Sequence, residues 1–170
     1  MSPLRLLAPA LLAAATPLAA QPPAVAPVSA SDAATAFAQL KRLVGTWRNA
    51  DAPESKLRVH FYLTAGGSVL VEDWRRGDAP HSLTLYHRDG PALLATHYCP
   101  QGNQPRLQLI GSGDGKRLTF AFRDATDLAA TESHQHALSF DLTDPKRVMR
   151  GETYRGPKGD EADTLALVRG

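Results

Sequence analysis

The clearest structural signal in the chain is the stretch Leu83-Thr84-Leu85-Tyr86-His87-Arg88-Asp89-Gly90-Pro91-Ala92-Leu93-Leu94-Ala95-Thr96-His97-Tyr98-Cys99, residues 83–99. Side chains alternate along a strand, so we expect Leu83, Leu85 and His87 to share one face. Asp-Gly is typical of a type I′ turn, because both central positions of that turn need a positive φ. The stretch therefore predicts an antiparallel hairpin that turns at residues 89–90.

Alternating apolar and polar residues continue on both sides of this hairpin. Turn signals at Gly66-Gly67, Asp114-Gly115, Asp144-Pro145 and 156–160 separate the runs, which gives about eight to ten short strands. No helical pattern lies between the strands, which argues against parallel βαβ units. No fixed repeat is present, which argues against propellers and solenoids. The pattern predicts an all-β barrel or sandwich.

The N-terminal residues have a different composition. In residues 1–20, Arg5 is the only charge, an apolar run follows it, and Ala19-Ala20 offers small residues for cleavage. This arrangement predicts a secretory signal peptide, with cleavage after Ala30 as an alternative, and places the protein in the periplasm or outside the cell. An apolar N-terminal helix of the fold is the other interpretation. Prolines and the short apolar run argue against stable membrane insertion.

Residues 21–31 are rich in Pro, Ala and Val and predict a disordered leader before a barrel domain at 32–170. Apolar residues then recur at helical spacing from residue 33 to residue 44. Ser31 or Asp32 can cap the start of this short helix, and Gly45 ends it.

A short motif follows the helix directly. Gly45-Thr46-Trp47, placed between a helix and the first strand, resembles the Gly-x-Trp opening of the lipocalins and their calycin relatives. The resemblance implies a closed antiparallel calycin-like barrel in which Trp47 plugs one end. It also implies that a basic residue of the last strand, here Arg169, packs across the indole ring.

A second motif covers residues 96–106. It consists of Thr96-His97-Tyr98-Cys99, a stiff polar turn, and Gly102-Asn103-Gln104-Pro105-Arg106. It resembles a motif of uncharacterised bacterial secreted calycin-like proteins, and that likeness implies no activity. Asn103 and Gln104 are of the residue types that close turns by hydrogen bonds from side chain to backbone.

Composition and charge narrow the choice of partners. The chain is 43% hydrophobic and 21% charged, which is ordinary for a soluble globular domain. A net charge of +2, without a run of like charges or interleaved aromatic and basic residues, argues against a nucleic-acid partner. Cys99 is the only cysteine and cannot form an internal disulfide. It is therefore a small buried hydrophobe, a ligand or a reactive thiol.

The inward residues of a barrel form one lining. A mostly apolar lining with a few polar groups suits a small apolar or amphipathic molecule, and such binding is the function we expect. The residues predicted to contact this ligand are Glu72, Trp74, Leu85, His87, His97, Cys99, Arg106, His134 and His136. A buried Glu72 needs a partner, for which Arg106 is the candidate; an exposed edge position for Glu72 is the alternative.

Two other functions use the same residues. In one, His97, Cys99, His134 and His136 converge on a metal ion or haem, since imidazole and thiolate suit zinc, copper and iron. The alternative is that His134 and His136 bond acidic neighbours on the outer face. In the other, Cys99 is the nucleophile of a hydrolase, and His97, His134 or His136 supplies the base.

A third class of function needs no cavity. In this interpretation the barrel is packed solid and the protein binds an envelope partner through its loops. The sequence leaves open the ligand, the cofactor and whether any substrate is turned over.

Overall fold

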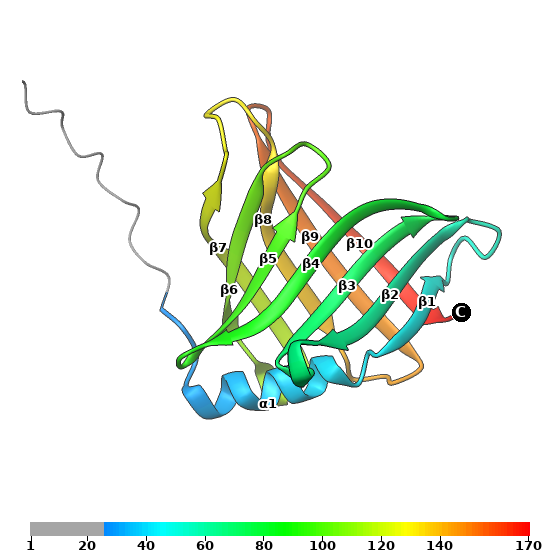
Figure 1. The fold of residues 1–170 in the computed structure, drawn as a ribbon, viewed down its shortest axis with the longest axis horizontal. Coiled ribbons are helices and arrows are strands. Elements are labelled where there is room, and N and C mark those ends of the chain that lie inside the picture. Colours follow the sequence, from blue (N-terminus) through cyan, green and yellow to red (C-terminus); the bar gives the residue numbers. More distant parts are fainter. Residues whose placement is uncertain (1–25) are drawn as a thin grey trace, which may run out of the picture.

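Within residues 26–170, ten antiparallel strands close into a barrel, and one α-helix covers one of its ends (Figure 1). The structure is a computed structural model that describes residues 26–170. The signal peptide predicted at 1–20 and residues 21–25 of the predicted leader lie outside these residues, and the last two residues of that leader already belong to α1. The elements are α1 (Ala30–Lys41), β1 (Gly45–Asn49), β2 (Leu57–Thr64), β3 (Val69–Arg76), β4 (Ala79–Asp89), β5 (Ala92–Tyr98), β6 (Gln104–Gly111), β7 (Arg117–Thr126), β8 (His134–Asp141), β9 (Arg147–Gly156) and β10 (Gly159–Arg169).

Each strand pairs with the next one in sequence, and β1 pairs with β10 to close the barrel. The turn at Asp89 and Gly90 joins β4 to β5 as the hairpin pattern predicts, with Gly90 at a φ of 55°. The predicted all-β class, the antiparallel barrel and the short N-terminal helix are confirmed.

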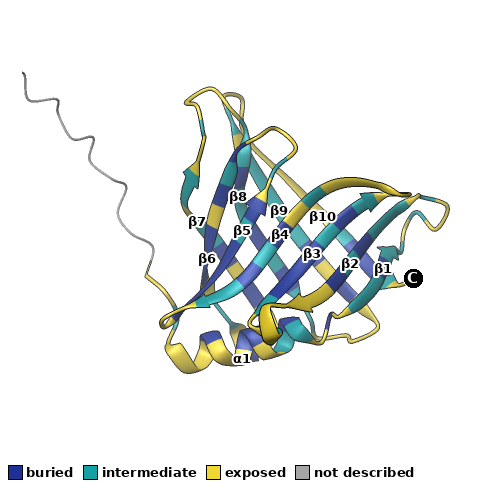
Figure 2. Ribbon diagram, in the orientation of Figure 1, coloured by how far each residue is buried: buried dark blue, intermediate teal, exposed yellow. Residues whose placement is uncertain are grey.

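The helix α1 begins two residues before the predicted domain boundary. Its N-cap is Ser29, whose hydroxyl accepts a hydrogen bond from the Asp32 backbone N–H, so neither Ser31 nor Asp32 is the cap. The face that holds Phe37 and Leu40 is buried against the barrel end, and the opposite face is exposed (Figure 2). Within residues 26–170, no helix has the length and apolar character needed to cross a membrane.

One face assignment was wrong. Leu83, Leu85 and His87 were expected to point inward, but Leu83 is exposed and the other two are half-buried on the outer side of β4. The inward positions of β4 are Thr84 and Tyr86, both 0% exposed. Alternation defines two faces of a strand but does not say which one enters the core.

The barrel end next to α1 is sealed by Trp47 and Arg169, which are paired across β1 and β10. The Arg169 guanidinium lies 4.2 Å from the centre of the Trp47 ring, and Trp47 Nε1 donates a hydrogen bond to the Leu43 carbonyl at 2.6 Å. Arg169 also donates to the carbonyls of Val44 and Arg42, at 2.7 Å and 3.1 Å. These bonds satisfy carbonyls at the end of the helix.

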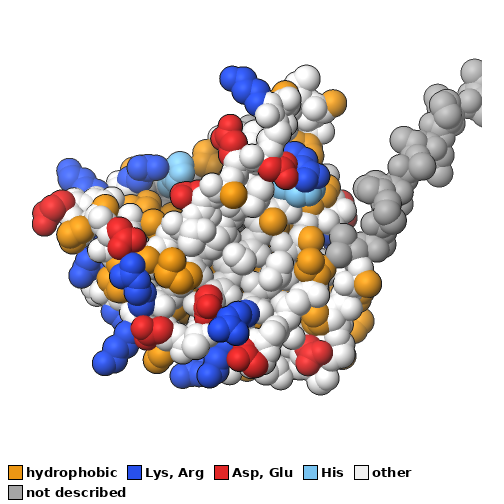
Figure 3. Space-filling model, turned by 180° about the vertical axis from the view of Figure 1, so that it is seen from behind, with side chains coloured by type: hydrophobic (Ala, Val, Ile, Leu, Met, Phe, Trp, Pro, Cys, Tyr) orange, Lys and Arg blue, Asp and Glu red, His pale blue; other side chains and the backbone are white. Residues whose placement is uncertain are grey.

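Charged side chains of both signs are interspersed on the outer surface (Figure 3). Several form exposed ion pairs between strands or loops, such as Arg117 with Asp141 and Arg147 with Asp51. The face shown in Figure 3 therefore has mixed charge rather than a patch of one sign.

Gly45 allows Arg169 to approach the backbone. Its φ is 130°, and a Cβ built there would lie 2.3 Å from Arg169 Nη1, which the helix-end carbonyls hold in place. Gly45→Ala should therefore lower the free energy of unfolding by about 1–3 kcal/mol, measured by urea denaturation. Gly66→Ala is the matched control, because Gly66 also has a positive φ but nothing within 4 Å of the added carbon. An equal loss in the two variants would contradict this account of Gly45.

Candidate functional site

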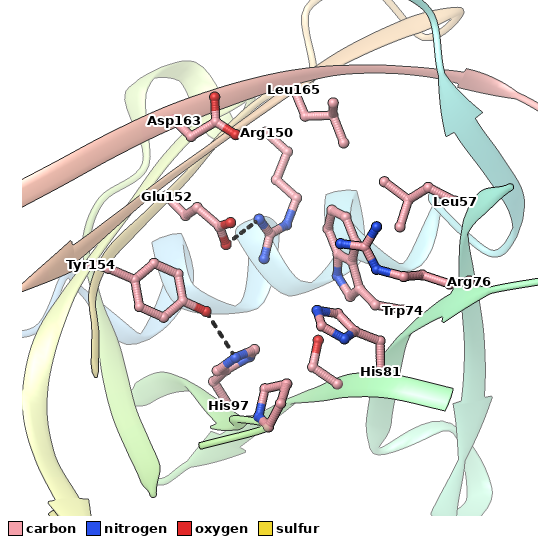
Figure 4. A pocket seen from close by; sticks show the side chains of 12 residues that line it. Leu57, Trp74, Arg76, His81, His97, Arg150, Glu152, Tyr154, Asp163 and Leu165 are labelled. Carbon is pink, nitrogen blue, oxygen red and sulfur yellow. Dashed lines mark hydrogen bonds and ion pairs between the residues drawn. The ribbon is translucent and has the colours of Figure 1, made fainter. Parts of the chain in front are cut away.

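A cavity of about 210 Å³ opens at the barrel end away from α1 (Figure 4). It is enclosed by β2, β3, β4, β5, β9 and β10, and most of its lining side chains are polar or charged. The lining residues are Leu57, Trp74, Arg76, His81, Ser82, His97, Pro100, Arg150, Glu152, Tyr154, Asp163 and Leu165.

The floor of the cavity is a buried ion pair. Arg150 and Glu72 are 2% and 0% exposed, and Arg150 Nε lies 2.5 Å from Glu72 Oε1. Trp74 Nε1 donates a hydrogen bond to Glu72 Oε1 at 2.7 Å, and the Tyr86 hydroxyl donates to Glu72 Oε2. The Arg150 guanidinium also lies 4.7 Å from the centre of the Trp74 ring. Three neighbours thus hold one buried carboxylate, as a charge withdrawn from water requires.

A second carboxylate lies above the first. Glu152 Oε2 accepts hydrogen bonds from Arg150 Nη1 at 2.8 Å and from Gln135 Nε2 at 3.1 Å. Burial works to raise the pKa of Glu152, but the charge of Arg150 and the hydrogen bonds from Arg150 and Gln135 together outweigh it and leave that pKa below its usual value. Glu152 is therefore ionised at neutral pH, and Arg150 is shared between two carboxylates.

His97 is held in the wall as a neutral imidazole. Its Nδ1 is hydrogen bonded to the Thr84 hydroxyl at 2.9 Å and its Nε2 to the Tyr154 hydroxyl at 3.2 Å. Burial, and next the charge of Arg150, lower the pKa of His97 from its usual 6.5 to about 4. Burial, and next the charge of Glu152, raise the pKa of Tyr154. Both groups therefore offer fixed hydrogen-bonding atoms without a charge at neutral pH.

The polar turn between β5 and β6 closes one side of the cavity mouth. The backbone N–H of Gly102 donates to the Cys99 carbonyl, and that of Cys99 donates to the Asn103 carbonyl, at 3.0 Å and 3.2 Å. Asn103 Nδ2 donates to the Ser133 carbonyl at 3.0 Å, and Gln104 Nε2 donates to the Gly102 carbonyl. Gln104 therefore closes the turn as predicted, whereas Asn103 bonds the loop before β8 instead of the turn itself.

The predicted site residues fall into three groups. Glu72, Trp74 and His97 lie together at the cavity or directly under it. The second group, Leu85, His87 and Arg106, lies outside the barrel. The pairing of Glu72 with Arg106 was wrong: Arg106 is half exposed and forms an ion pair with Asp124 across β6 and β7. Arg150 takes the place inside because β9, not β6, directs its basic residue inward.

The third group lies apart from the cavity wall. His134 Nε2 is 3.3 Å from His136 Nδ1, and both rings contact Phe122. A bulge between Gln135 and Ala137 alters the alternation, so Gln135 is the residue that reaches Glu152. The expected convergence of His97, Cys99, His134 and His136 is not found, and no group of three or more potential metal ligands occurs among the described residues.

Cys99 is half-buried at the end of β5, and burial raises the pKa of its thiol. Both ring nitrogens of His97 are bonded to hydroxyl groups, so His97 is not placed to activate the Cys99 thiol. A catalytic cysteine needs a lowered pKa and an adjacent base, and the geometry around Cys99 supplies neither.

Three residues of the site were missed: Arg150, Glu152 and Tyr154. They alternate along β9 with outward neighbours, and the same inward face begins at Val148. An apolar residue followed at every second position by Arg, Glu and Tyr is the signal that was available. A charged side chain at an inward position of a strand needs a partner of opposite charge. Arg150 and Glu152 on the inward face of β9 therefore indicate a buried ion pair.

Removing Arg150 leaves Glu72 buried without its counter-charge. Arg150→Met should lower the free energy of unfolding by about 3–5 kcal/mol, measured by urea denaturation. The double variant Arg150→Met with Glu72→Gln should recover part of this loss, because the uncompensated buried charge is gone. Arg106→Met breaks an exposed pair and should cost about 1 kcal/mol or less. Similar losses for Arg150→Met and Arg106→Met would contradict the buried pair.

The low pKa of His97 predicts a loss of stability in acid. Unfolded His97 takes up a proton near pH 6.5, whereas the folded protein resists protonation down to about pH 4. This contribution is therefore complete above pH 6.5 and is lost as the pH falls to about 4, up to about 3 kcal/mol. His97→Gln should flatten the stability profile in that window, while His134→Gln, on a more exposed ring whose pKa is lowered less, should flatten it less. Identical slopes for wild type and His97→Gln would refute the assignment.

No protein-family model matches the chain, and no curated protein matches its sequence. The described residues form a closed ten-stranded antiparallel barrel, which is consistent with a calycin-like fold.

Proposed function

We propose that this protein binds a small amphipathic molecule in the cavity at the open end of the barrel. The observation that carries the proposal is the division of the cavity wall (Figure 4). Apolar groups of Leu57, Leu165 and Trp74 lie on one side, and Glu152, His97 and Tyr154 contribute polar groups on the other. Small-molecule sites place fixed polar groups beside apolar surface, and in this cavity the polar side chains outnumber the apolar ones, which suits an amphipathic ligand.

The floor of the cavity favours an amphipathic ligand over a purely apolar one. Arg150 and Glu152 both line the cavity, and covering them with hydrocarbon alone would remove their remaining solvation. The cavity volume of about 210 Å³ equals roughly seven times the share of one water molecule in the liquid. A ligand of a few heavy atoms, or one end of a longer molecule, is the appropriate size.

The protonation states support binding rather than proton transfer. A general base or acid works best with a pKa near the working pH. The pKa of His97 lies well below neutrality, and the pKa values of Tyr154 and Cys99 are raised by burial. All three groups therefore keep one protonation state at pH 7 and serve as fixed donors and acceptors.

The proposal includes membership in the calycin superfamily and action in the periplasm or outside the cell. The closed barrel, the helix at one end and the stacking of Arg169 on Trp47 support the first part. The composition of residues 1–20 supports the second. The presence of a cavity favours this function over the interpretation as a solid barrel that acts only through its loops.

Filling the cavity tests the proposal. Ser82 lies in the cavity wall and is half-buried, so Ser82→Phe should place a ring in the cavity and abolish binding while the barrel stays folded. The measurement is native mass spectrometry of protein purified from its producing cells, followed by titration of short-chain alcohols monitored by the Trp74 indole NMR signal. Leu83→Phe, one residue away on the outer surface, is the matched control.

We expect Leu83→Phe to retain the ligand and Ser82→Phe to have none. Circular dichroism shows whether both variants keep the β-sheet fold. Equal ligand uptake by folded Ser82→Phe and wild type would place the ligand elsewhere and overturn the proposal.

A further inference from the structure

We infer that the ligand carries a positive charge: the cavity selects a small organic cation, a primary ammonium group on a short apolar chain. The inference rests on the proposed function and specifies the chemical class of the ligand. Three observations support it: the balance of charge around the cavity floor, the Glu152 oxygen that remains available to accept a hydrogen bond from a ligand, and the position of the apolar wall.

The charges at the floor do not cancel. Arg150 lies between two carboxylates, Glu72 at 2.5 Å and Glu152 at 2.8 Å. His97 beside them is neutral, because burial holds its pKa near 4. The cavity floor therefore has two negative charges, on Glu72 and Glu152, and one positive charge, on Arg150. In a partly desolvated site such an unbalanced charge is costly. A cationic ligand would restore the balance, and an anionic one would increase the excess.

The unbalanced charge is accessible from the cavity. The side chain of Glu152 is 27% exposed although its neighbours at the floor are almost fully buried, and Glu152 itself lines the cavity. Both hydrogen bonds that hold it, from Arg150 and Gln135, end on Oε2. The second oxygen, Oε1, is therefore the acceptor offered to a ligand, and an ammonium group is the donor that suits a carboxylate best.

Nearby groups complete a site for an ammonium. The hydroxyl of Tyr154 lies beside Glu152 and can accept a hydrogen bond while it stays bonded to His97 (Figure 4). The guanidinium of Arg150 does not compete for an anion, since it is shared between two carboxylates and covers the Trp74 ring. Leu57 and Leu165 lie across the cavity from these polar groups and suit a short hydrocarbon chain.

Charges at the mouth do not change this preference. Arg76, His81 and Asp163 line the opening, and all three are exposed to solvent. Arg76 and Asp163 have opposite signs, and exposed charges are screened by water and salt. The selection of ligand charge therefore depends on the buried groups.

The test is a comparison of three probes that share one chain length: butylamine, butan-1-ol and butyrate. Each is titrated at pH 7 into the full-length protein, and the indole N–H signals of the two tryptophans are followed by NMR. Trp74 reports on the cavity, and Trp47, at the opposite end, is the internal reference. Butylamine should bind at least about tenfold more tightly than butan-1-ol, as a charge-assisted hydrogen bond provides, and butyrate should bind most weakly.

The variant Glu152→Gln removes the negative charge and keeps the shape of the side chain. It should lower the affinity for butylamine about tenfold more than it lowers the affinity for butan-1-ol. Glu54→Gln is the matched control, because it makes the same change on an exposed loop residue that does not line the cavity. If Glu152→Gln fails to fold, the affinities of the three probes for the wild-type protein still show whether the cavity selects a cation.

The outcomes separate the two proposals. Equal binding of butan-1-ol and butylamine, or tighter binding of butyrate, overturns the cationic ligand and leaves a cavity that binds amphipathic molecules. A Trp74 signal that no probe shifts, in a protein that is also purified without a bound molecule, overturns the proposed function and the cationic ligand with it. A preference for butylamine that disappears in Glu152→Gln supports both.

Discussion

The buried ion pair between Arg150 and Glu72 is the constraint on which the rest of the interior depends. Two charges almost without solvent contact require excellent geometry and further hydrogen bonds, since the cost of desolvation is several kcal/mol for each ion. Trp74 and Tyr86 supply those bonds from the same strand and from its neighbour. The pair therefore fixes which faces of β3, β4 and β9 point inward, and side chains below it pack as an apolar core.

The same pair divides the barrel into two parts with different roles. Toward α1, the interior is filled by apolar side chains such as Phe120 and Leu109, and Trp47 with Arg169 closes the end. Toward the open end, the charged floor lies under a cavity that is lined by His97, Tyr154 and Glu152 and that apolar side chains do not fill. The charged groups thus serve as a structural layer and as the polar part of the candidate site.

The sequence predicted the fold more fully than the site, and particular residues show why. Turn residues and alternation are local signals, so the strands, the hairpin at Asp89-Gly90 and the position of the helix could be recognised. The inward face of β4 could not, because Leu83 and Leu85 are more apolar than Thr84 and Tyr86, yet Glu72 needs the Tyr86 hydroxyl. A bulge in β8 likewise moved His136 away from the expected lining and brought Gln135 to Glu152. Contacts between distant strands determine such choices, and no local pattern contains them.

The central claim is that the open end of this barrel is a ligand site built on a charged floor. Its most direct test is a crystal structure, at pH 7, of the protein as purified from its producing cells. The account predicts Arg150 between Glu72 and Glu152, with electron density for a small organic molecule between Tyr154 and Leu165. An Arg150 side chain turned out to solvent, or neighbouring side chains filling the space between Tyr154 and Leu165, would contradict it.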